Sequence, residues 1–179
     1  MQNLTKKWSE EMKSIKQLRG TTVDVDLTAT ETKNWVKAAF DGGVITLTNT
    51  GSDRGRVHTT QSFGAPIKIE LRIKLSDPIF QVLLHRGSLK FSQKDGVNEL
   101  TIINVVNKDE TIYEGLGDIP VGEFVDVEWI IADEYTAVYV NGSLRYFAKE
   151  TLMEEFSSLV SICCYRDMVV EVESLKITQ

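Results

Sequence analysis

The spacing of apolar residues changes near residue 20, which divides the chain into two parts. In the first part apolar residues recur at steps of three and four with charged residues between them; they are Leu4, Trp8, Met12, Ile15 and Leu18. This period predicts an amphipathic helix within residues 1–20 that ends at Gly20. An exposed apolar stripe is rare on a monomer. We therefore expect Trp8, Met12 and Ile15 to be covered, either by the domain that follows or by a second copy of the chain.

From residue 21 onward the period is two, which is typical of half-buried strands. The clearest case is 67–75, where five aliphatic residues alternate with Lys68, Glu70, Arg72 and Lys74. The dipeptide Asn141-Gly142 between two such runs is a strong hairpin signal. Ten to twelve short strands follow one another with no alternating helices. This arrangement predicts an all-β fold, a sandwich of two antiparallel sheets over 21–179, preceded by one helix over 1–20.

Three segments resemble the concanavalin A-like lectin/glucanase superfamily, which includes laminin G-like and glycoside hydrolase 16-like domains. The segment 122–145, GEFVDVEWIIADEYTAVYVNGSLR, is similar to a strand ending near a Trp that meets a second strand ending in Asn-Gly. The stretch 63–75 resembles the long early strand of the superfamily, and 160–177 resembles its closing pair. The resemblance implies a jelly-roll sandwich. It does not decide the activity, because this fold carries lectins, glycosidases and adhesion modules.

Charge and composition exclude several classes of partner. The chain has a net charge of -6 and a pI near 5.0, whereas a nucleic-acid backbone requires clustered Lys and Arg. No apolar run approaches the roughly 20 residues of a membrane span. No apolar segment of a secretory signal follows the N-terminus. Cys163 and Cys164 are adjacent, so a bridge between them would be strained, and two buried free thiols are expected. These features favour a cytoplasmic protein.

The resemblance implies a test for catalysis. Hydrolases of this superfamily carry Glu-x-Asp-x-x-Glu on one strand, and the corresponding positions here are Asp126, Glu128 and Ile131. Asp126 and Glu128 share one face of a strand. The third position is aliphatic, so the expected acid/base is missing. We therefore predict no catalytic residues in this strand. A glycoside hydrolase whose acids come from different strands stays open as an alternative.

Calcium is the common ion of the superfamily, and it requires six to eight oxygen ligands. Asp24 and Asp26 near the start could meet Glu171 and Glu173 near the end, because first and last strands are often neighbours in such sandwiches. No loop carries dense ligand spacing. We therefore expect no cofactor and no metal site. Calcium is the one ion that these four carboxylates could still bind.

Sugar binding requires aromatic faces and planar hydrogen-bonding groups. The candidates are Trp35, Glu70, Arg72, His85, Arg86 and Tyr165. His85 is in phase with Gln81, and we expect these two to share a polar face with Glu70 and Arg72. That face would suit the floor of a groove, and equally a salt-bridged outer surface. Trp129 is in phase with Val125 and Val127 and is expected in the core.

One further motif is Gly-rich and basic. The segment 51–56, GSDRGR, lacks the following helix that a phosphate-binding loop needs. We interpret it as a flexible hairpin tip.

The sequence as a whole predicts a non-catalytic binding module for carbohydrate. Because a signal sequence is not seen, such a module would serve as a sensor joined to another domain, or as a homodimer, through the N-terminal helix. The alternatives are a glycoside hydrolase or related sugar-processing enzyme, and a structural or protein-interaction domain.

Overall fold

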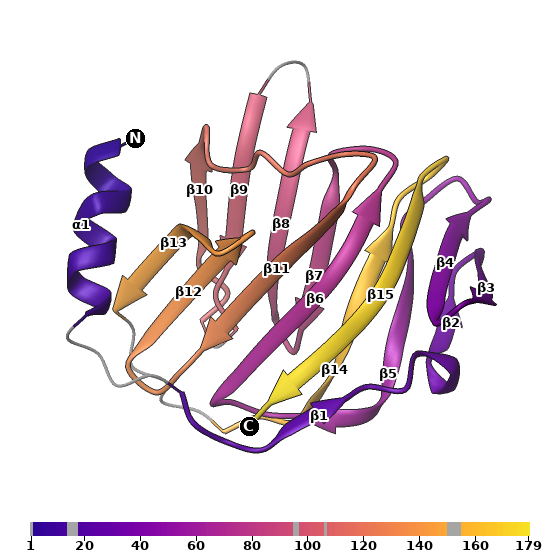
Figure 1. Cartoon of the computed structure of the whole chain (residues 1–179), viewed down its shortest axis with the longest axis horizontal. Coiled ribbons are helices and arrows are strands. Elements are labelled where there is room, and N and C mark those ends of the chain that lie inside the picture. The colour runs from indigo at the N-terminus through magenta and orange to yellow at the C-terminus, as the bar shows by residue number, and fades with distance from the viewer. Residues whose placement is uncertain (1, 14–17, 95–96, 106, 150–154) are drawn as a thin grey trace.

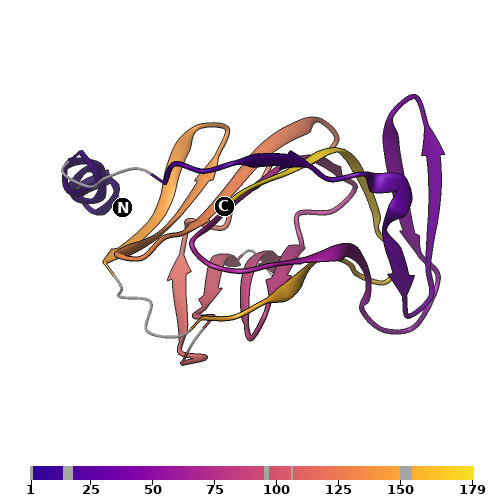
Figure 2. The same cartoon turned by 90° about the horizontal axis from the view of Figure 1, so that it is seen from below.

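The computed structural model describes residues 2–13, 18–94, 97–105, 107–149 and 155–179. Within them the chain forms two antiparallel sheets that pack face to face (Figures 1 and 2). Sheet A has, in spatial order, β13 (Ser143–Lys149), β12 (Tyr135–Val140), β11 (Phe124–Ile131), β6 (Ile67–Leu75), β15 (Val169–Thr178), β4 (Val44–Asn49) and β3 (Val36–Asp41), with β1 (Thr22–Asp24) paired to β15. Sheet B has β10 (Glu110–Glu114), β9 (Val97–Ile103), β8 (Gly87–Lys94), β7 (Phe80–Leu84), β14 (Ser158–Cys164), β5 (Gly55–Phe63) and β2 (Glu31–Lys33). The predicted all-β sandwich is confirmed.

The core lies between the sheets, and β6 shows how the alternating pattern builds it. All five of its aliphatic residues, at 67, 69, 71, 73 and 75, are buried, while the charged residues between them point away from the core. Trp129 on β11 lies opposite Ile69 on β6 and is 1% exposed. The prediction that Trp129 is a core residue is therefore confirmed.

The hairpin between β12 and β13 forms at the predicted dipeptide. Asn141 and Gly142 both have positive φ, at 48° and 71°, as a two-residue hairpin turn of this type requires. The Asn141 side chain accepts a hydrogen bond of 2.9 Å from the backbone N–H of Asp126 on the neighbouring β11. The turn is thereby tied to the adjacent strand.

The N-terminal helix is shorter than the sequence predicts. Helix α1 spans Gln2–Met12, and Leu18, Arg19 and Gly20 are not helical. Gly20 does not act as a helix terminator. It lies against Gln179 at the end of β15, where a Cβ would collide with the Gln179 carbonyl. The segment that contains Gly20 thus leads into β1, which pairs with the last strand, β15.

Helix α1 covers the edge of the sandwich where β13 and β10 lie (Figure 1). Trp8 is 6% exposed. Its ring forms T-shaped contacts with Tyr113 on β10 and Tyr146 on β13, at centroid distances of 5.6 and 6.0 Å. Met12 packs partly buried beside the core, and Ile15 lies outside the described residues. The expected burial of Trp8 is confirmed, and its cover is the sandwich itself. Pairing of the helix with a second copy or another domain stays a prediction.

In the described part of the chain no helix is long and apolar enough to cross a membrane. The short 3₁₀ turn η1 (Leu27–Ala29) follows β1, and Asp26 begins it by accepting hydrogen bonds from the Thr28 N–H and hydroxyl.

Candidate functional site

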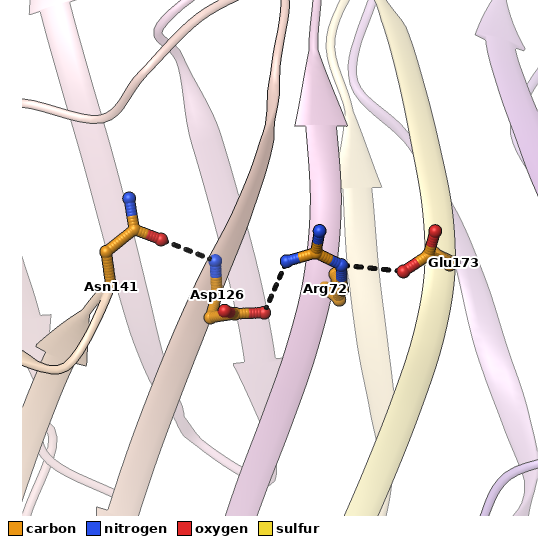
Figure 3. Close-up of polar contacts among 4 residues, drawn as sticks. All are labelled: Arg72, Asp126, Asn141 and Glu173. Atoms are coloured by element: carbon orange, nitrogen blue, oxygen red, sulfur yellow. Dashed lines mark hydrogen bonds and ion pairs between the residues drawn. The ribbon is translucent and has the colours of Figure 1, made fainter.

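The outer face of sheet A carries charges that neutralise one another. Arg72 on β6 lies between two carboxylates: its Nη1 is 3.1 Å from Asp126 on β11, and its Nε is 2.6 Å from Glu173 on β15 (Figure 3). Glu70 pairs with Lys68 at 2.9 Å. This face is therefore a salt-bridged surface, one of the two readings that the sequence allowed.

The outer face of sheet B is different, because a groove of about 420 Å³ runs over it. Five strands contribute its walls and floor, namely β5, β7, β8, β9 and β14, together with the turns next to them. Its apolar lining comes from Leu83, Ile103 and Leu159. Its polar lining consists of Arg54, Arg56, His58, Gln81, His85, Arg86, Ser88, Ser158 and Ser161. No Asp or Glu is among the lining residues.

This arrangement corrects one expectation. Gln81 and His85 lie at the groove of sheet B, whereas Glu70 and Arg72 lie on the opposite outer face of the sandwich. All four belong to neighbouring strand segments, but the chain crosses from sheet A to sheet B between β6 and β7. The expectation that these four residues share one polar face is therefore wrong. The alternation along one strand cannot show that the next strand belongs to the other sheet.

Gln81 on β7 organises one end of the groove. Its side-chain oxygen accepts hydrogen bonds from Arg54 Nη1 at 2.6 Å and from the Tyr165 hydroxyl at 2.8 Å. Gln81 is 6% exposed, so it is a buried polar group whose oxygen is fully used. Burial raises the pKa of Tyr165, which keeps its hydroxyl protonated as a donor. Tyr165, a predicted site residue, thus supports this end of the groove through Gln81.

His58 on β5 is the most buried titratable group that lines the groove. Its Nδ1 lies 2.8 Å from the Ser161 hydroxyl on β14, directly across the strand pair. Its Nε2 is buried and has no hydrogen-bond partner. Burial, with Arg56 and Lys33 nearby, lowers the pKa of His58 despite the opposing charge of Glu31. The imidazole is therefore neutral at neutral pH, with one nitrogen available.

Two more buried polar atoms at the groove are without partners. They are Nε of Arg56 and the hydroxyl oxygen of Ser88. Buried polar atoms without partners are uncommon in folded proteins, and each one calls for an explanation. Three of them gather here, because His58, Arg56 and Ser88 all line the same groove. The residues around this groove therefore hold hydrogen-bonding capacity that the described protein groups do not use.

Small side chains occupy the outer face of β14, and one of them, Ser161, lines the groove. Ser161 and Cys163 on β14 alternate on the outer face, and each is at most 5% exposed. Cys163 lies between Arg56 and Gln81 in the cross-strand register. Burial raises the pKa of the Cys163 thiol to about 11, so the group is a protonated thiol and a poor nucleophile. Cys164 points into the core, and both cysteines are free and buried as expected.

His85 and Arg86 form the turn between β7 and β8 and line the groove at its other end. His85 has φ of 53°, and its ring stacks on Phe156 with a centroid distance of 4.9 Å and an interplanar angle of 9°. Its backbone N–H donates to the Ser158 hydroxyl at 3.1 Å. The sequence placed His85 on a strand, but it lies in the turn that follows.

Trp35 lies at the end of the sandwich that also holds Arg54. It is 60% exposed and has φ of 62°, a conformation that bulky residues rarely adopt. With Asn34 it turns the chain from β2 in sheet B to β3 in sheet A. Its ring rests on Gly51 of the β4–β5 loop, where a Cβ would lie 2.6 Å from the indole. It does not line the groove itself.

The carboxylates proposed for calcium are engaged elsewhere. The first and last strands do pair, as expected. Glu173 and Glu171, however, bind Arg72 and Lys74, and Asp26 begins η1. Asp24 lies 3.7 Å from Lys176. Among the described residues, no three or more His, Cys, Asp or Glu side chains form a group that could hold a metal ion. These four carboxylates do not fit a calcium site.

Three groove residues that matter most were missed by sequence reasoning, namely Arg54, Arg56 and His58. The segment 51–56 is not simply a hairpin tip, because Gly55 and Arg56 already belong to β5. The available signal was the period-two spacing of the two arginines and the histidine, which places them on one side of an extended chain. Gln81 was recognised only as a neighbour in phase with His85.

A second hollow, of about 460 Å³, lies at the edge of sheet A between η1 and the β3–β4 turn. Its charged lining residues are all acidic: Asp24, Asp26, Asp41 and Glu173. None of the buried unpartnered polar atoms of the described residues lies in it. The groove on sheet B is therefore the stronger candidate site.

Comparison with known proteins bears on the fold. No protein-family model and no curated protein sequence matches the chain. Solved structures do match. A carbohydrate-binding module, CBM66 from Bacillus subtilis, is 11% identical with a TM-score of 0.60, over 84% of this chain and 96% of that one. A prokaryotic β-1,3-1,4-glucanase (lichenase) from a mouse hindgut metagenome is 11% identical with a TM-score of 0.63, over 90% of this chain and 99% of that one.

A third similar structure is the carbohydrate recognition domain of Emp46p, 7% identical with a TM-score of 0.58, over 85% of this chain and 89% of that one. At these identities the likeness concerns the fold. The chain has the concanavalin A-like jelly-roll fold that its sequence resembles.

Proposed function

We propose that this protein is a non-catalytic carbohydrate-binding module and that the groove on sheet B is its binding site. The observation that carries the proposal is the set of three buried polar atoms without partners, on Arg56, His58 and Ser88, in one groove. Leaving such atoms unpaired costs about 1–3 kcal/mol each, which a hydrogen-bonding ligand would offset. Two of the similar structures, CBM66 and the Emp46p domain, are named for binding or recognising carbohydrate.

The chemistry of the lining suits a sugar. Sugar hydroxyls both donate and accept hydrogen bonds, and the groove presents both kinds of group. Guanidinium groups donate only, whereas serine hydroxyls and a neutral imidazole can do either. The small residue Ser161 in the lining leaves room for a ring to lie against the sheet. His85, held by its stack on Phe156, lines the groove beside Arg86.

Trp35 extends the site at the end where Arg54 lies. An exposed tryptophan in a strained backbone conformation is costly, and strain of this kind tends to accumulate where function requires it. Its indole offers a large rigid face to a sugar ring. We infer that Trp35 contacts the part of a longer glycan that leaves the groove.

Hydrolysis of a glycoside is the second candidate, favoured by the likeness to the lichenase. Such a reaction requires two carboxyl groups that flank the scissile bond. The residues that line the groove include no Asp and no Glu. Asp126 and Glu128 lie on sheet A, and Ile131 in the third position is a buried core residue. Binding without turnover is therefore the better account. Attachment to another domain and a cytoplasmic location stay predictions from the sequence.

The test is a glycan array combined with a panel of chromogenic glycosides. We expect binding to a subset of glycans and no turnover of any glycoside. Gln81→Ala should abolish binding, because Arg54 and Tyr165 lose their common acceptor. Glu70→Gln on sheet A is the matched control and should bind as the unaltered protein does. A blank array would contradict the proposal, and turnover that persists in purified protein would favour the enzyme.

A further inference from the structure

We propose that the groove on sheet B selects an anionic polysaccharide, one whose sugars carry carboxylate or sulfate groups. This inference rests on the proposed carbohydrate-binding function and adds the class of ligand. It comes from the sign of the charge in the groove, which is opposite to that of the whole chain. The chain has a net charge of -6. By contrast, the charged side chains that line the groove are those of Arg54, Arg56 and Arg86, and no carboxylate is among them.

The cations follow the sheet in register. Across the outer face of sheet B, Lys33 on β2 lies beside Arg56 on β5. The same row continues through Cys163 and Gln81 to Lys90 on β8. Five strands at about 4.8 Å spacing place the outer two cations about 19 Å apart. A polymer lying across the strands along this row would meet several positive charges, so repeated anionic groups would each find a partner.

Two arginines of the groove, Arg54 and Arg56, are not neutralised by any described carboxylate. Arg72 on the other face contacts two carboxylates. By contrast, within the described residues Arg54 and Arg56 form no ion pair, and the side-chain partner of Arg54 is the neutral amide of Gln81. Nε of Arg56 is buried with no acceptor. A guanidinium without a counter-charge is costly to bury, and an anionic ligand would remove that cost.

The carboxylates of this face lie outside the groove: Glu99 is on the inner strand β9, Asp53 directly precedes Arg54, and two more are at the edges. Glu31 on β2 is paired in register with His58, and Glu110 on β10 is at the opposite edge of the sheet. Both are exposed. Neither lines the groove, so the centre of the face keeps its positive charge.

Gln81 also prepares Arg54 for an anion. Its side-chain oxygen holds one nitrogen of the guanidinium, so the orientation of the planar group is set before a ligand arrives. A pre-oriented guanidinium loses less conformational freedom when it binds a carboxylate or sulfate with two hydrogen bonds. Nucleic acid is a polyanion as well, but proteins that bind single strands stack the bases on aromatic rings. Of the two rings in the lining, His85 is already stacked on Phe156 and His58 is only 6% exposed.

The experiment is isothermal titration with four polymers: polygalacturonate, dextran sulfate, neutral dextran and polyphosphate. We expect one of the two anionic polysaccharides to bind, which identifies carboxylate or sulfate as the recognised group. Its affinity should fall as salt is raised, because charge pairs are screened. Neutral dextran and polyphosphate should bind at least tenfold more weakly.

Matched arginine variants give the decisive comparison. Arg56→Gln and Arg54→Gln each remove one charge from the groove. Each substitution should weaken binding at least tenfold. Arg72→Gln removes the same charge from sheet A and should change the affinity less than twofold. An equal loss in all three variants would overturn the inference, because it would show a dependence on net charge alone. Equal binding of polyphosphate would overturn it too.

The outcomes separate this inference from the proposed function. If neutral glycans bind, and their binding is lost in Gln81→Ala but not in Arg56→Gln, the groove binds sugars without selecting anions. The proposed function would then stand, and the present inference would be wrong. If neither the glycan array nor the four polymers show binding, both proposals fail.

Discussion

Arg54 donates to the side-chain oxygen of Gln81 at 2.6 Å, and this bond joins the β4–β5 loop to the middle of sheet B. The same oxygen accepts from Tyr165, which follows β14. Three segments distant in sequence therefore meet at one buried amide. The contact fixes the position of the guanidinium although Arg54 itself is exposed.

The first prediction concerns the strained Trp35. Trp35→Asn should weaken glycan binding at least about fivefold, because the exposed indole face is lost. Asn tolerates positive φ better than Trp does, so stability should change by less than about 1 kcal/mol. Titration and urea unfolding of the same sample measure the two effects. A large loss of stability with unchanged binding would show that Trp35 is a packing residue.

The second prediction concerns the ion pairs on the outer face of sheet A. Arg72→Ala removes both of its ion pairs and its contact with the Phe124 ring at 5.6 Å. Exposed pairs contribute little, so the free energy of unfolding should fall by no more than about 1 kcal/mol. The loss should shrink at high salt. Chemical denaturation at low and high salt checks this.

Glycan binding by Arg72→Ala should be unchanged, since Arg72 lies on the face opposite the groove. Impaired binding in this variant would instead place the ligand on sheet A, and the assignment of the groove would have to be abandoned.

The third prediction concerns the contact of helix α1 with the sandwich. Trp8→Ala should lower the free energy of unfolding by about 3 kcal/mol, the usual cost of truncating a large buried aromatic residue. Leu4→Ala on the same helix is the control, because Leu4 is 37% exposed and should cost under about 0.5 kcal/mol. Equal unfolding midpoints for the two variants would show that the helix is only a tether.

The fourth prediction is a pH dependence that comes from His58. Its pKa is lowered in the folded state by burial and by Arg56, so the unfolded chain takes up the proton first as the pH falls. Stability is therefore complete above about pH 6.5, the ordinary histidine value, and is lost as the pH falls through that value toward the folded pKa. In His58→Gln this part of the pH dependence should disappear.

Thermal melts of both proteins between pH 5 and 8 check the fourth prediction. A profile for His58→Gln that keeps the full slope of the unaltered protein would mean that another group is responsible.

The type of fold and most of the core follow from local patterns in the amino-acid sequence. Alternation of apolar and charged residues in 67–75, together with the Asn141-Gly142 turn, is local information. Each strand needs an apolar face, and each tight turn needs residues that accept positive φ. The burial of Trp8 and Trp129 follows from the same patterns, as does the opposite direction of Cys163 and Cys164.

Which residues share a surface depends instead on how the strands are arranged in the folded protein. Gln81 and Arg72 are only nine positions apart, yet the crossover between β6 and β7 places them on opposite outer faces of the sandwich. Arg56, His58 and Ser161 meet because β5 pairs with β14, a contact between segments about one hundred residues apart. Pairing of distant strands depends on how all the strands pack together. The alternation of apolar and polar residues along one strand contains no information about that pairing. The charge of the groove is therefore a property of the folded sheet, whereas the acidic charge of the chain can be counted from its residues.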